Sequence, residues 1–372
     1  MSQAEMPDAL QGLGRAPSIV TLLTTYRCTA ACAHCCFGCN PKHRGGTMSL
    51  RRMRRYVDMV LEAFPGDIKL LALSGGECSL LGWRLPLIIL YARLRGLMSR
   101  IVTNGHWATS LTRATRRLRW LQRLGLTEVN FSTEDDHQAW VPLERIVHGC
   151  VAAYRLGMRC VVNVETHPLH TFTYHQFREI PAIAEILAAQ QESGTELLTI
   201  VPGVWVTNEP LHTPEATRKE EAPNGMEIPP RRQGCDSLFN TLTIDPQGRI
   251  PACCGLTVKQ NAFLQVADRV GSPQEMRQSW YNQYTDFLKL WLEAEGPLAV
   301  LEYIYRKQGE PVPEHWVSRH ACDLCREIFR PERLAALRQV YHELEGGIFF
   351  RSLLKRRYEA HMGGACRCAI AS

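Results

Sequence analysis

Three cysteines near the start of the chain have the residue type and spacing of a metal centre. Cys28, Cys32 and Cys35 follow the first predicted strand with the spacing C-x3-C-x2-C. Four cysteine thiolates normally complete a four-iron, four-sulfur cluster. Three thiolates therefore leave one iron open to a small molecule, just as catalytic zinc sites keep one position open. The spacing predicts an open cluster, and the alternatives are a zinc site or chance clustering.

A second group of thiols lies in the C-terminal part of the chain. Cys235 and Cys253 flank a glycine in the pattern C-x12-G-x4-C, and Cys322 and Cys325 form a C-x2-C pair. Two pairs supply the four ligands of one closed cluster. Zinc is the alternative, because C-x2-C pairs also bind zinc tetrahedrally. The sequence leaves open the roles of six further cysteines: Cys36, Cys39, Cys78, Cys254, Cys366 and Cys368.

Polar residues follow three further predicted strands. Glu77 ends the segment Ser74-Gly75-Gly76-Glu77, where glycines let a ligand approach the backbone closely. Asn104 follows the third strand. The fourth strand ends at Ser132 and runs into Asp135, Asp136 and His137, which are candidates for substrate binding or proton transfer. The alternatives are a tight turn at the glycines and a polar helix cap after the fourth strand.

Together, the cysteine loop and the Gly-Gly-Glu segment resemble the radical S-adenosylmethionine (SAM) enzymes. Their signature is C-x3-C-x-aromatic-C, and His34 stands in the aromatic position. The resemblance implies that SAM chelates the open iron through its amino and carboxylate groups. It also implies that one electron then splits the sulfonium to a 5′-deoxyadenosyl radical, which removes a hydrogen atom from the substrate.

The same resemblance implies roles for the residues at the strand ends. The backbone of the Gly-Gly-Glu segment and the Glu77 carboxylate would contact the SAM amino group, and Ser132 would contact the ribose or methionine part. The positions expected to bind SAM are His34, Ser74, Gly75, Gly76, Glu77, Asn104 and Ser132. Cys78 stands where the family more often has proline or threonine, and we expect it to pack in the core.

The spacing from Cys235 to Cys253 resembles the start of the SPASM and twitch extensions, which hold auxiliary clusters in radical SAM enzymes. A full SPASM extension continues with more cysteines, and Arg326–Gly364 contains none. The sequence is therefore similar to the shorter twitch form. This resemblance implies one auxiliary four-iron, four-sulfur cluster, with these ligands: Cys235, Cys253, Cys322 and Cys325.

Strands and helices are expected to alternate in the first part of the chain. The predicted strands are Ser18–Thr25, Ile68–Leu73, Ser99–Thr103, Glu128–Ser132, Cys160–Glu165 and Glu196–Val201. The predicted helices between them are Leu50–Phe64, Leu85–Leu97, Leu111–Leu124, Leu143–Leu156 and Tyr174–Ala188. Alternation of this kind predicts parallel strands with helical crossovers. We therefore expect an α/β fold, a partial (β/α)6 TIM-like barrel with its active site at the carboxyl ends of the strands.

A smaller auxiliary-cluster domain is expected after the barrel. A hairpin of Asn240–Asp245 and Arg249–Ala252 would open it, and helices would follow at Ser272–Glu293 and Pro331–Leu344. The predicted domains are an N-terminal tail at 1–17, the radical SAM core at 18–206, a linker at 207–232, the auxiliary-cluster domain at 233–330, and a C-terminal helix and tail at 331–372.

Composition points to a soluble protein of a reducing compartment. The chain has 15 cysteines in clusters, no secretory signal and no apolar run long enough for a membrane helix. We therefore expect a cytoplasmic protein. The net charge is +6, and the basic runs Arg51–Arg55 and Arg113–Arg123 are expected to be solvated helix faces. No RNA-binding motif accompanies them, so neither nucleic acid nor membrane is an expected partner.

The leading hypothesis is a radical SAM oxidoreductase that oxidatively modifies, for example by cross-linking, a ribosomally synthesised precursor peptide. A flavodoxin- or ferredoxin-type reductant would supply the electron. Only residues 1–17 precede the first predicted strand, so a separate protein is expected to recognise the leader peptide. One alternative is a radical SAM dehydrogenase that oxidises a small-molecule alcohol. Another is a non-catalytic iron–sulfur or zinc protein.

Overall fold

The computed structural model describes residues 14–33, 35, 37–165, 170–203, 234–235, 237–253, 264–313, 321–338 and 341–361. These residues form two compact units. Residues 18–203 and 243–249 belong to the first, which we call the barrel unit. Residues 14–17, 234–242 and 250–361 belong to the second, which we call the helical unit. The predicted linker 207–232 and the tail Gly363–Ser372 lie outside the described residues.

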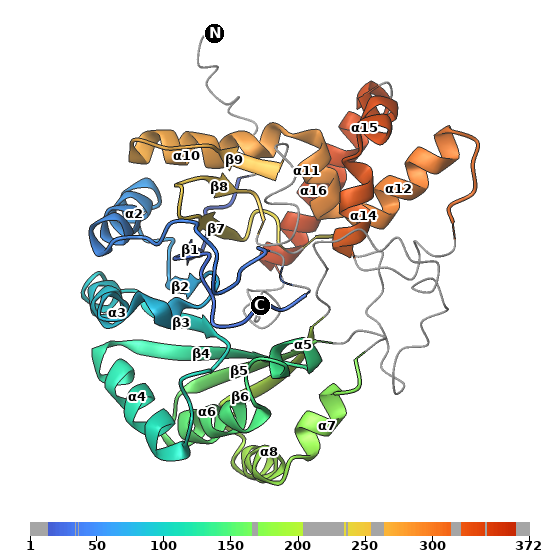
Figure 1. Cartoon of the computed structure of the whole chain (residues 1–372). Helices are drawn as coiled ribbons and strands as arrows, with labels where there is room; N and C mark the ends of the chain where they lie inside the picture. Colours follow the sequence, from blue (N-terminus) through green and yellow to red (C-terminus); the bar gives the residue numbers. More distant parts are fainter. Residues whose placement is uncertain are drawn as a thin grey trace. The chain divides into compact units, whose positions relative to one another are not determined.

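A parallel sheet forms the centre of the barrel unit (Figure 1). Its strands in chain order are β1 (Ile19–Leu23), β2 (Leu70–Ser74), β3 (Met98–Thr103), β4 (Leu126–Thr133), β5 (Arg159–Glu165) and β6 (Leu198–Gly203). Each of these strands pairs in parallel with the next one along the chain. The predicted α/β fold with consecutive parallel strands is therefore confirmed.

Helices connect the strands. They are α2 (Leu50–Ala63), η1 (Cys78–Leu81), α3 (Arg84–Leu94), α4 (Leu111–Leu124), α5 (Asp135–Gln138), α6 (Leu143–Arg155), α7 (Tyr174–Glu179) and α8 (Pro181–Ser193). The single helix predicted at Tyr174–Ala188 is wrong, because it breaks at Ile180. Pro181 disfavours helical geometry in the preceding residue, and Ile180 accordingly has a ψ of 125°.

The two faces of the sheet differ in chemistry. Phe131 in β4 packs towards α6, where a Cβ added to Gly149 would lie 2.4 Å from the Phe131 ring. Ser132, the next residue, must point to the opposite face, because side chains alternate along a strand. That opposite face also holds a buried ion pair between Arg100 and Glu128, with 2.6 Å between Nε and Oε1. The interior of the barrel is therefore partly polar.

A seventh strand, β7 (Thr241–Ile244), extends the sheet beside β1, so the sheet order is β6-β5-β4-β3-β2-β1-β7. The predicted hairpin is wrong in its pairing, because β8 (Ile250–Pro251) pairs instead with β9 (Gln265–Ala267) in antiparallel fashion. The predicted turn is nevertheless present, since Gly248 N donates to Asp245 O at 2.9 Å. The edge of β1 offers unpaired backbone groups, and a buried apolar strand satisfies them better than an isolated hairpin does.

The turn after β7 is anchored within the barrel unit. The buried Asp245 carboxylate accepts hydrogen bonds from the Tyr26 hydroxyl at 3.1 Å and from Arg249 Nε at 2.7 Å. Arg52 in α2 donates to the carbonyl of Pro246 at 2.7 Å. Tyr26 lies two residues before Cys28, so this turn supports the start of the cysteine loop.

The helical unit consists mainly of helices. They are α10 (Pro273–Asn282), η5 (Gln283–Thr285), α11 (Phe287–Ala294), α12 (Gly296–Lys307), α14 (Ala321–Ile328), α15 (Pro331–Arg338) and α16 (Tyr341–His361). The helix predicted at Ser272–Glu293 is interrupted before Asp286, which caps the next helix by accepting from Lys289 N at 3.2 Å. The helix predicted at Pro331–Leu344 overlaps α15 and the beginning of α16, and the two residues between them lie outside the described residues. Sequence periodicity did not reveal α12 or α14. Among the described residues, none of the helices has the length and apolar character needed to cross a membrane.

Candidate functional site

Cys28, Cys32 and Cys35 lie on the loop between β1 and α2, at the carboxyl end of the sheet, and each is half-buried. Burial raises the pKa of Cys28 to about 11, and the charges of Glu77 and Cys35 add to the effect. Burial also raises the pKa of Cys32, with further contributions from Glu134, Cys35 and Cys28. The three sulfurs therefore lie within electrostatic range of one another.

Cys35 differs from the other two thiols. Hydrogen bonding from Cys39 outweighs burial and lowers the pKa of Cys35 to about 6, with a smaller contribution from the charge of His137. The backbone N–H of Cys39 donates to Cys35 Sγ at 3.3 Å, and the side chain of Cys39 is itself buried. Cys39, whose role the sequence left open, thus stabilises the thiolate form of Cys35.

The two glycines of the Gly-Gly-Glu segment press against the backbone of the cysteine loop. A Cβ on Gly75, whose φ is +134°, would lie 2.4 Å from Thr25 O, and one on Gly76 would lie 2.1 Å from Arg27 O. Gly76 N donates to Thr25 O at 2.6 Å. Glycine is required here because the two backbones touch, and this contact sets the position of Cys28.

Hydrogen bonds continue the β1–β2 pairing past the ends of the strands. The carbonyl of Ser74, the last residue of β2, accepts from Thr24 N at 2.8 Å and from Thr24 Oγ1 at 2.9 Å. Glu77 N donates to Arg27 O at 2.9 Å. Ser74 and Glu77 thus both hold the cysteine loop through backbone atoms.

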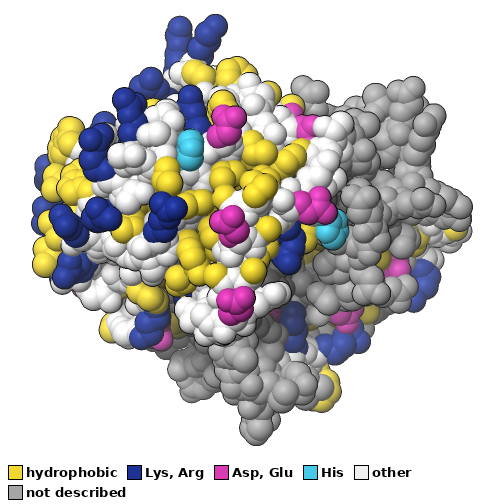
Figure 2. All heavy atoms as spheres, turned by 90° about the horizontal axis from the view of Figure 1, so that it is seen from below, with side chains coloured by type: hydrophobic (Ala, Val, Ile, Leu, Met, Phe, Trp, Pro, Cys, Tyr) yellow, Lys and Arg dark blue, Asp and Glu magenta, His cyan; other side chains and the backbone are white. Residues whose placement is uncertain are grey.

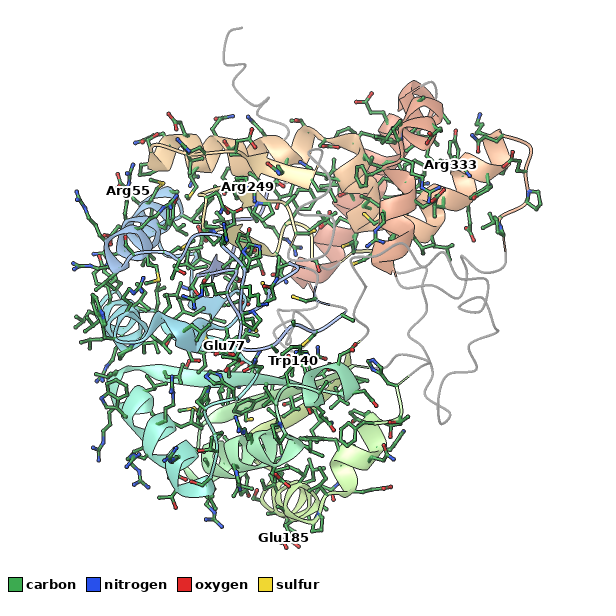
Figure 3. The ribbon with its side chains drawn as sticks, in the orientation of Figure 1. Arg55, Glu77, Trp140, Glu185, Arg249 and Arg333 are labelled. Atoms are coloured by element: carbon green, nitrogen blue, oxygen red, sulfur yellow. The ribbon has the colours of Figure 1, made fainter. Side chains whose placement is uncertain are left out.

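The Glu77 side chain is fully buried (Figure 3). Oε1 accepts from Ser79 N and Thr103 Oγ1, each at 2.9 Å, and Oε2 accepts from Asn104 N at 2.9 Å. The carboxylate therefore joins the loop after β2 to the loop after β3. These bonds define a supporting role for Glu77, and its expected contact with SAM stays a prediction.

Asn104 connects the loop after β3 to the cysteine loop. Its Nδ2 donates to Thr29 Oγ1 at 2.9 Å and lies 3.6 Å from Cys28 Sγ. Its Oδ1 accepts from His106 N at 3.2 Å. Asn104 is buried and orients Cys28, which the sequence alone did not reveal.

The end of β4 contributes charged groups near Cys32 and Cys35. Glu134 is fully buried and caps α5 by accepting from His137 N at 2.9 Å, and its carboxylate also pairs with His137 Nδ1. Since the Glu134 charge acts on Cys32 and the His137 charge on Cys35, this pair lies beside the cysteine loop. His137 was predicted as a site residue. Glu134 was missed, although it stands in the same polar run.

The other two candidates of this run bind a neighbouring segment. Asp135 accepts from Thr171 Oγ1 at 2.6 Å and from Phe172 N at 2.8 Å. Although partial burial opposes the change, these hydrogen bonds lower the pKa of Asp135. Asp136 pairs with His170 Nε2 at 3.3 Å. Asp135 thus fixes the chain before α7.

The interior face of the sheet carries a further polar pair that sequence reasoning missed. Ser132 in β4 is the register partner of Asn163 in β5, so both project into the barrel. Asn163 is only 5% exposed, and within the described residues its Oδ1 has no hydrogen-bond partner. A Cβ on Gly203 would lie 2.1 Å from this oxygen, so a larger residue at this position would force the Asn163 amide to move. Asn163 is therefore available to accept a hydrogen bond from a bound molecule.

In the part of the chain that the structure describes, no group of three or more His, Cys, Asp or Glu side chains is arranged to hold one metal ion. Ligation of a cluster by Cys28, Cys32 and Cys35 therefore stays a prediction.

The predicted second group of cysteines lies within the helical unit. Burial raises the pKa of Cys325 well above its usual value, and the charges of Cys253 and Cys235 add to this. Cys322 and Cys325 are three residues apart on α14 and therefore share one helix face. Cys235 N donates to Leu292 O in α11 at 2.8 Å. The structure thus brings Cys235, Cys253 and Cys325 within electrostatic range of one another.

The remaining predicted residues divide into two sets. Cys78 is fully buried, and its Sγ donates to Val102 O at 3.2 Å, as expected for a core residue. The residues outside the described part of the chain are His34, Cys36, Cys254, Cys366 and Cys368.

Part of the barrel unit matches a known protein family. Residues 22–182 match the model of the Radical SAM superfamily, and this range contains the cysteine loop, the Gly-Gly-Glu segment and Asn163. A Radical SAM superfamily domain thus covers most of the barrel unit, which confirms the resemblance seen in the sequence. The match does not reach the helical unit, so the twitch or SPASM assignment stays a prediction.

Solved structures of low sequence identity are also similar to the chain. One is BtrN in complex with AdoMet and 2-DOIA, with 14% identity over 75% of this chain and 88% of that chain and a TM-score of 0.42. Another is native anSMEcpe with bound AdoMet, with 12% identity over 74% of this chain and 84% of that chain and a TM-score of 0.46. No curated protein matches the chain in sequence.

We predict that Gly76→Ala displaces the cysteine loop. The new methyl group would meet the Arg27 carbonyl, and overpacking against backbone costs about 1–3 kcal/mol or more. Thermal unfolding should show a lower Tm, and iron analysis after reconstitution should show less iron per chain. Gly46→Ala is the matched control, because the nearest atom to its Cβ is 3.9 Å away. Equal iron content in both variants would contradict the role assigned to Gly76.

Proposed function

We propose that this chain is a radical SAM oxidoreductase. One observation supports the proposal above all: three half-buried thiols at the carboxyl end of β1 lie on a loop fixed by the Gly-Gly-Glu segment and by Asn104. When bound there, a four-iron cluster supplies the electron that splits SAM into methionine and a 5′-deoxyadenosyl radical, which then removes a hydrogen atom from substrate.

The residues of the chain hold and orient the reactants. Cys28, Cys32 and Cys35 would bind three irons and leave the fourth to SAM. The two glycines let the backbone after β2 lie directly against the cysteine loop, which positions Cys28. On the interior face, Ser132 and Asn163 offer hydrogen-bonding groups for a bound molecule. Held in this way, the reactants gain from proximity and from exclusion of water.

The non-catalytic alternative is weaker on two grounds. A structural centre is closed by four protein ligands, whereas the family spacing supplies three. The Asn163 Oδ1 acceptor, buried without a partner among the described residues, also carries the desolvation cost of a lone polar group. Such a group is expected where a ligand completes the hydrogen bond.

We predict that anaerobically reconstituted protein releases 5′-deoxyadenosine when supplied with SAM and dithionite. Cys32→Ala should reduce the product to background, because it removes a cluster ligand. Cys150→Ala is the control, since this buried thiol lies near Cys160, between α6 and β5, and should leave turnover intact. Liquid chromatography quantifies the product. If wild-type protein that carries its full iron forms none, the proposal fails.

We further propose that Cys235, Cys253, Cys322 and Cys325 bind one auxiliary four-iron cluster. The clustering of three of these thiols and the shared helix face of the fourth support it. Oxidation of the substrate releases an electron, and an auxiliary cluster gives this electron an acceptor. A reducing, cytoplasmic location belongs to the same proposal, since clustered thiols persist there.

Iron analysis tests the auxiliary cluster. Wild-type protein should contain about eight irons and eight sulfides per chain, as two four-iron clusters require. Cys325→Ala should lower both to about four while 5′-deoxyadenosine is still formed in the absence of substrate. About four irons together with one zinc ion in the wild type would show instead that the second group of thiols binds zinc.

Two classes of substrate could undergo the proposed oxidation. The first is a ribosomally made precursor peptide that acquires a cross-link or a similar oxidation, with a separate protein to recognise its leader. The second is a small-molecule alcohol. Ser132 and Asn163 support the small-molecule alcohol, because the hydroxyl group of such a substrate can donate to the Asn163 Oδ1 atom.

We predict that a precursor peptide encoded beside the gene loses two hydrogen atoms per cross-link when it is incubated with the holoenzyme and SAM. High-resolution mass spectrometry measures the loss, and deuterium at the attacked carbon should appear in 5′-deoxyadenosine. A peptide that stays unchanged, together with deuterium transfer from a polyol substrate, would replace the peptide assignment with the alcohol one.

A further inference from the structure

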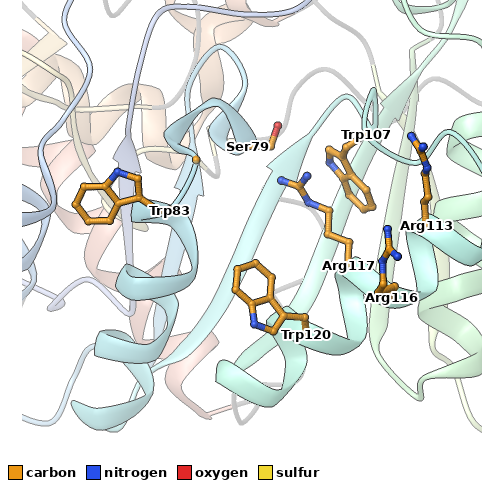
Figure 4. Close-up of a pocket in the computed structure, with 8 residues that line it drawn as sticks. Ser79, Trp83, Trp107, Arg113, Arg116, Arg117 and Trp120 are labelled. Carbon is orange, nitrogen blue, oxygen red and sulfur yellow. The ribbon is translucent and has the colours of Figure 1, made fainter.

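A groove lies on the outer side of the barrel unit, between the start of α3 and the exposed face of α4 (Figure 4). Its volume is about 640 Å³. Indole rings and guanidinium groups dominate its lining: Trp83, Trp107, Trp120, Arg113, Arg116 and Arg117. The Trp83 side chain is 67% exposed and Trp120 is 52% exposed. Exposed indoles beside guanidinium groups are typical of binding surfaces, which are enriched in Trp and Arg.

The groove continues along α4 into a second cavity of about 730 Å³, and the two share Arg116 and Trp120. The second cavity adds Arg119, Arg123 and Arg155. No carboxylate lines either cavity, all of whose lining residues fall within the described range 37–165. Figure 2 shows Lys and Arg side chains gathered, with hydrophobic side chains between them, on the side where Figure 1 places α3 and α4. The positive charge of this lining therefore favours an anionic occupant.

The floor of the groove is bonded to the residues that hold Cys28. Arg117 lies over the Trp107 ring, 5.0 Å from its centroid. Trp107 Nε1 donates to Thr103 Oγ1 at 3.0 Å, and Thr103 in turn donates to Glu77. The residue after Thr103 is Asn104, whose Nδ2 lies 3.6 Å from Cys28 Sγ. These contacts thus connect the groove to Cys28, one of the proposed cluster ligands.

The groove lies on the helix-facing side of the sheet, whereas a substrate is expected on the interior side. Trp107 packs against Phe131, with 6.0 Å between the ring centroids, and Phe131 faces the helices. The reacting carbon of a substrate must instead lie in the interior, on the face of Ser132 and Asn163. A partner at the groove approaches Cys28 from outside and leaves the interior free for SAM and substrate.

We propose that this groove docks an acidic one-electron carrier protein, which reduces the open cluster from outside the barrel. The proposal rests on the proposed function, because only a reductive cleavage needs such a donor. In the transfer, the reduced carrier loses one electron and the cluster gains one, while no bond or proton moves. Contacts of this kind are small and polar, and opposite charges speed the encounter.

The experiment measures binding and reduction separately. The groove variant is the double charge reversal Arg113→Glu with Arg116→Glu, since both side chains are exposed and neither contributes to the core. The matched control is Arg51→Glu with Arg55→Glu, which reverses two exposed charges on α2. The probe is a flavodoxin with a strongly negative surface. Titration calorimetry on the reconstituted proteins should show roughly tenfold weaker binding for the groove variant, about 1.4 kcal/mol, and little change for the control.

Reduction provides the second measurement. With reduced flavodoxin as donor, 5′-deoxyadenosine formation should fall several-fold in the groove variant. With dithionite, a small molecule that needs no docking surface, the groove variant and the control should both match the wild type. In the wild type, flavodoxin binding should weaken as salt rises, because the attraction is between charges at the surface.

Three outcomes overturn the proposal. In the first, the groove variant binds flavodoxin as tightly as the control does. In the second, the groove variant loses dithionite-driven turnover to the same extent as flavodoxin-driven turnover. In the third, a single-stranded RNA displaces flavodoxin from the wild type at equal concentration, which would identify the groove as a nucleic-acid surface. Failure of the proposed function looks different, since dithionite then yields no 5′-deoxyadenosine even in the wild type.

Discussion

The buried carboxylate of Glu77 is the interaction on which the geometry of the site depends. It accepts from Ser79 N, Thr103 Oγ1 and Asn104 N, and so replaces the water it loses with three donors. A buried carboxylate without such partners would be strongly destabilising. Because these donors come from the segment after β2 and from the end of β3, one side chain fixes the two relative to each other. Asn104 then extends the connection to Cys28 and to the cysteine loop.

Backbone contacts hold the cysteine loop in place, and its three thiols differ in how readily they lose a proton. Burial disfavours the thiolate of Cys28 and of Cys32, whereas the Cys39 hydrogen bonds favour the thiolate of Cys35. Metal ligation requires all three in the thiolate form, and positive iron supplies the stabilisation that burial denies to the first two. In the proposed function, Cys28 and Cys32 would therefore depend on bound iron to become thiolates more than Cys35 does.

Much of the barrel could be predicted from the sequence, because parallel strands buried on both faces have near-continuous apolar residues and short crossovers. Predictions failed where a local signal competed with the tertiary fold. The turn at Gly248 was found, but sequence alone could not show that β7 joins β1 and leaves β8 to β9, since strand pairing depends on distant partners. In the same way, Asn163 shows no motif of its own. Its significance comes from its register with Ser132 and from an acceptor that has no donor among the described residues, and both depend on the three-dimensional structure.

Under the proposed function, the two faces of the sheet would separate the two tasks of a reductive radical enzyme. A reactive radical requires a dry interior, whereas a protein that delivers electrons requires an open and charged surface. Phe131 faces the helices and Ser132, its neighbour, faces the interior, so the end of a single strand serves both sides. Thr103 stands at the same boundary, between Trp107 on the outer side and Glu77 beneath the cysteine loop. Under this proposal, substitutions at these boundary positions would act on both tasks, while substitutions of the exposed arginines of α4 would act on the outer one alone.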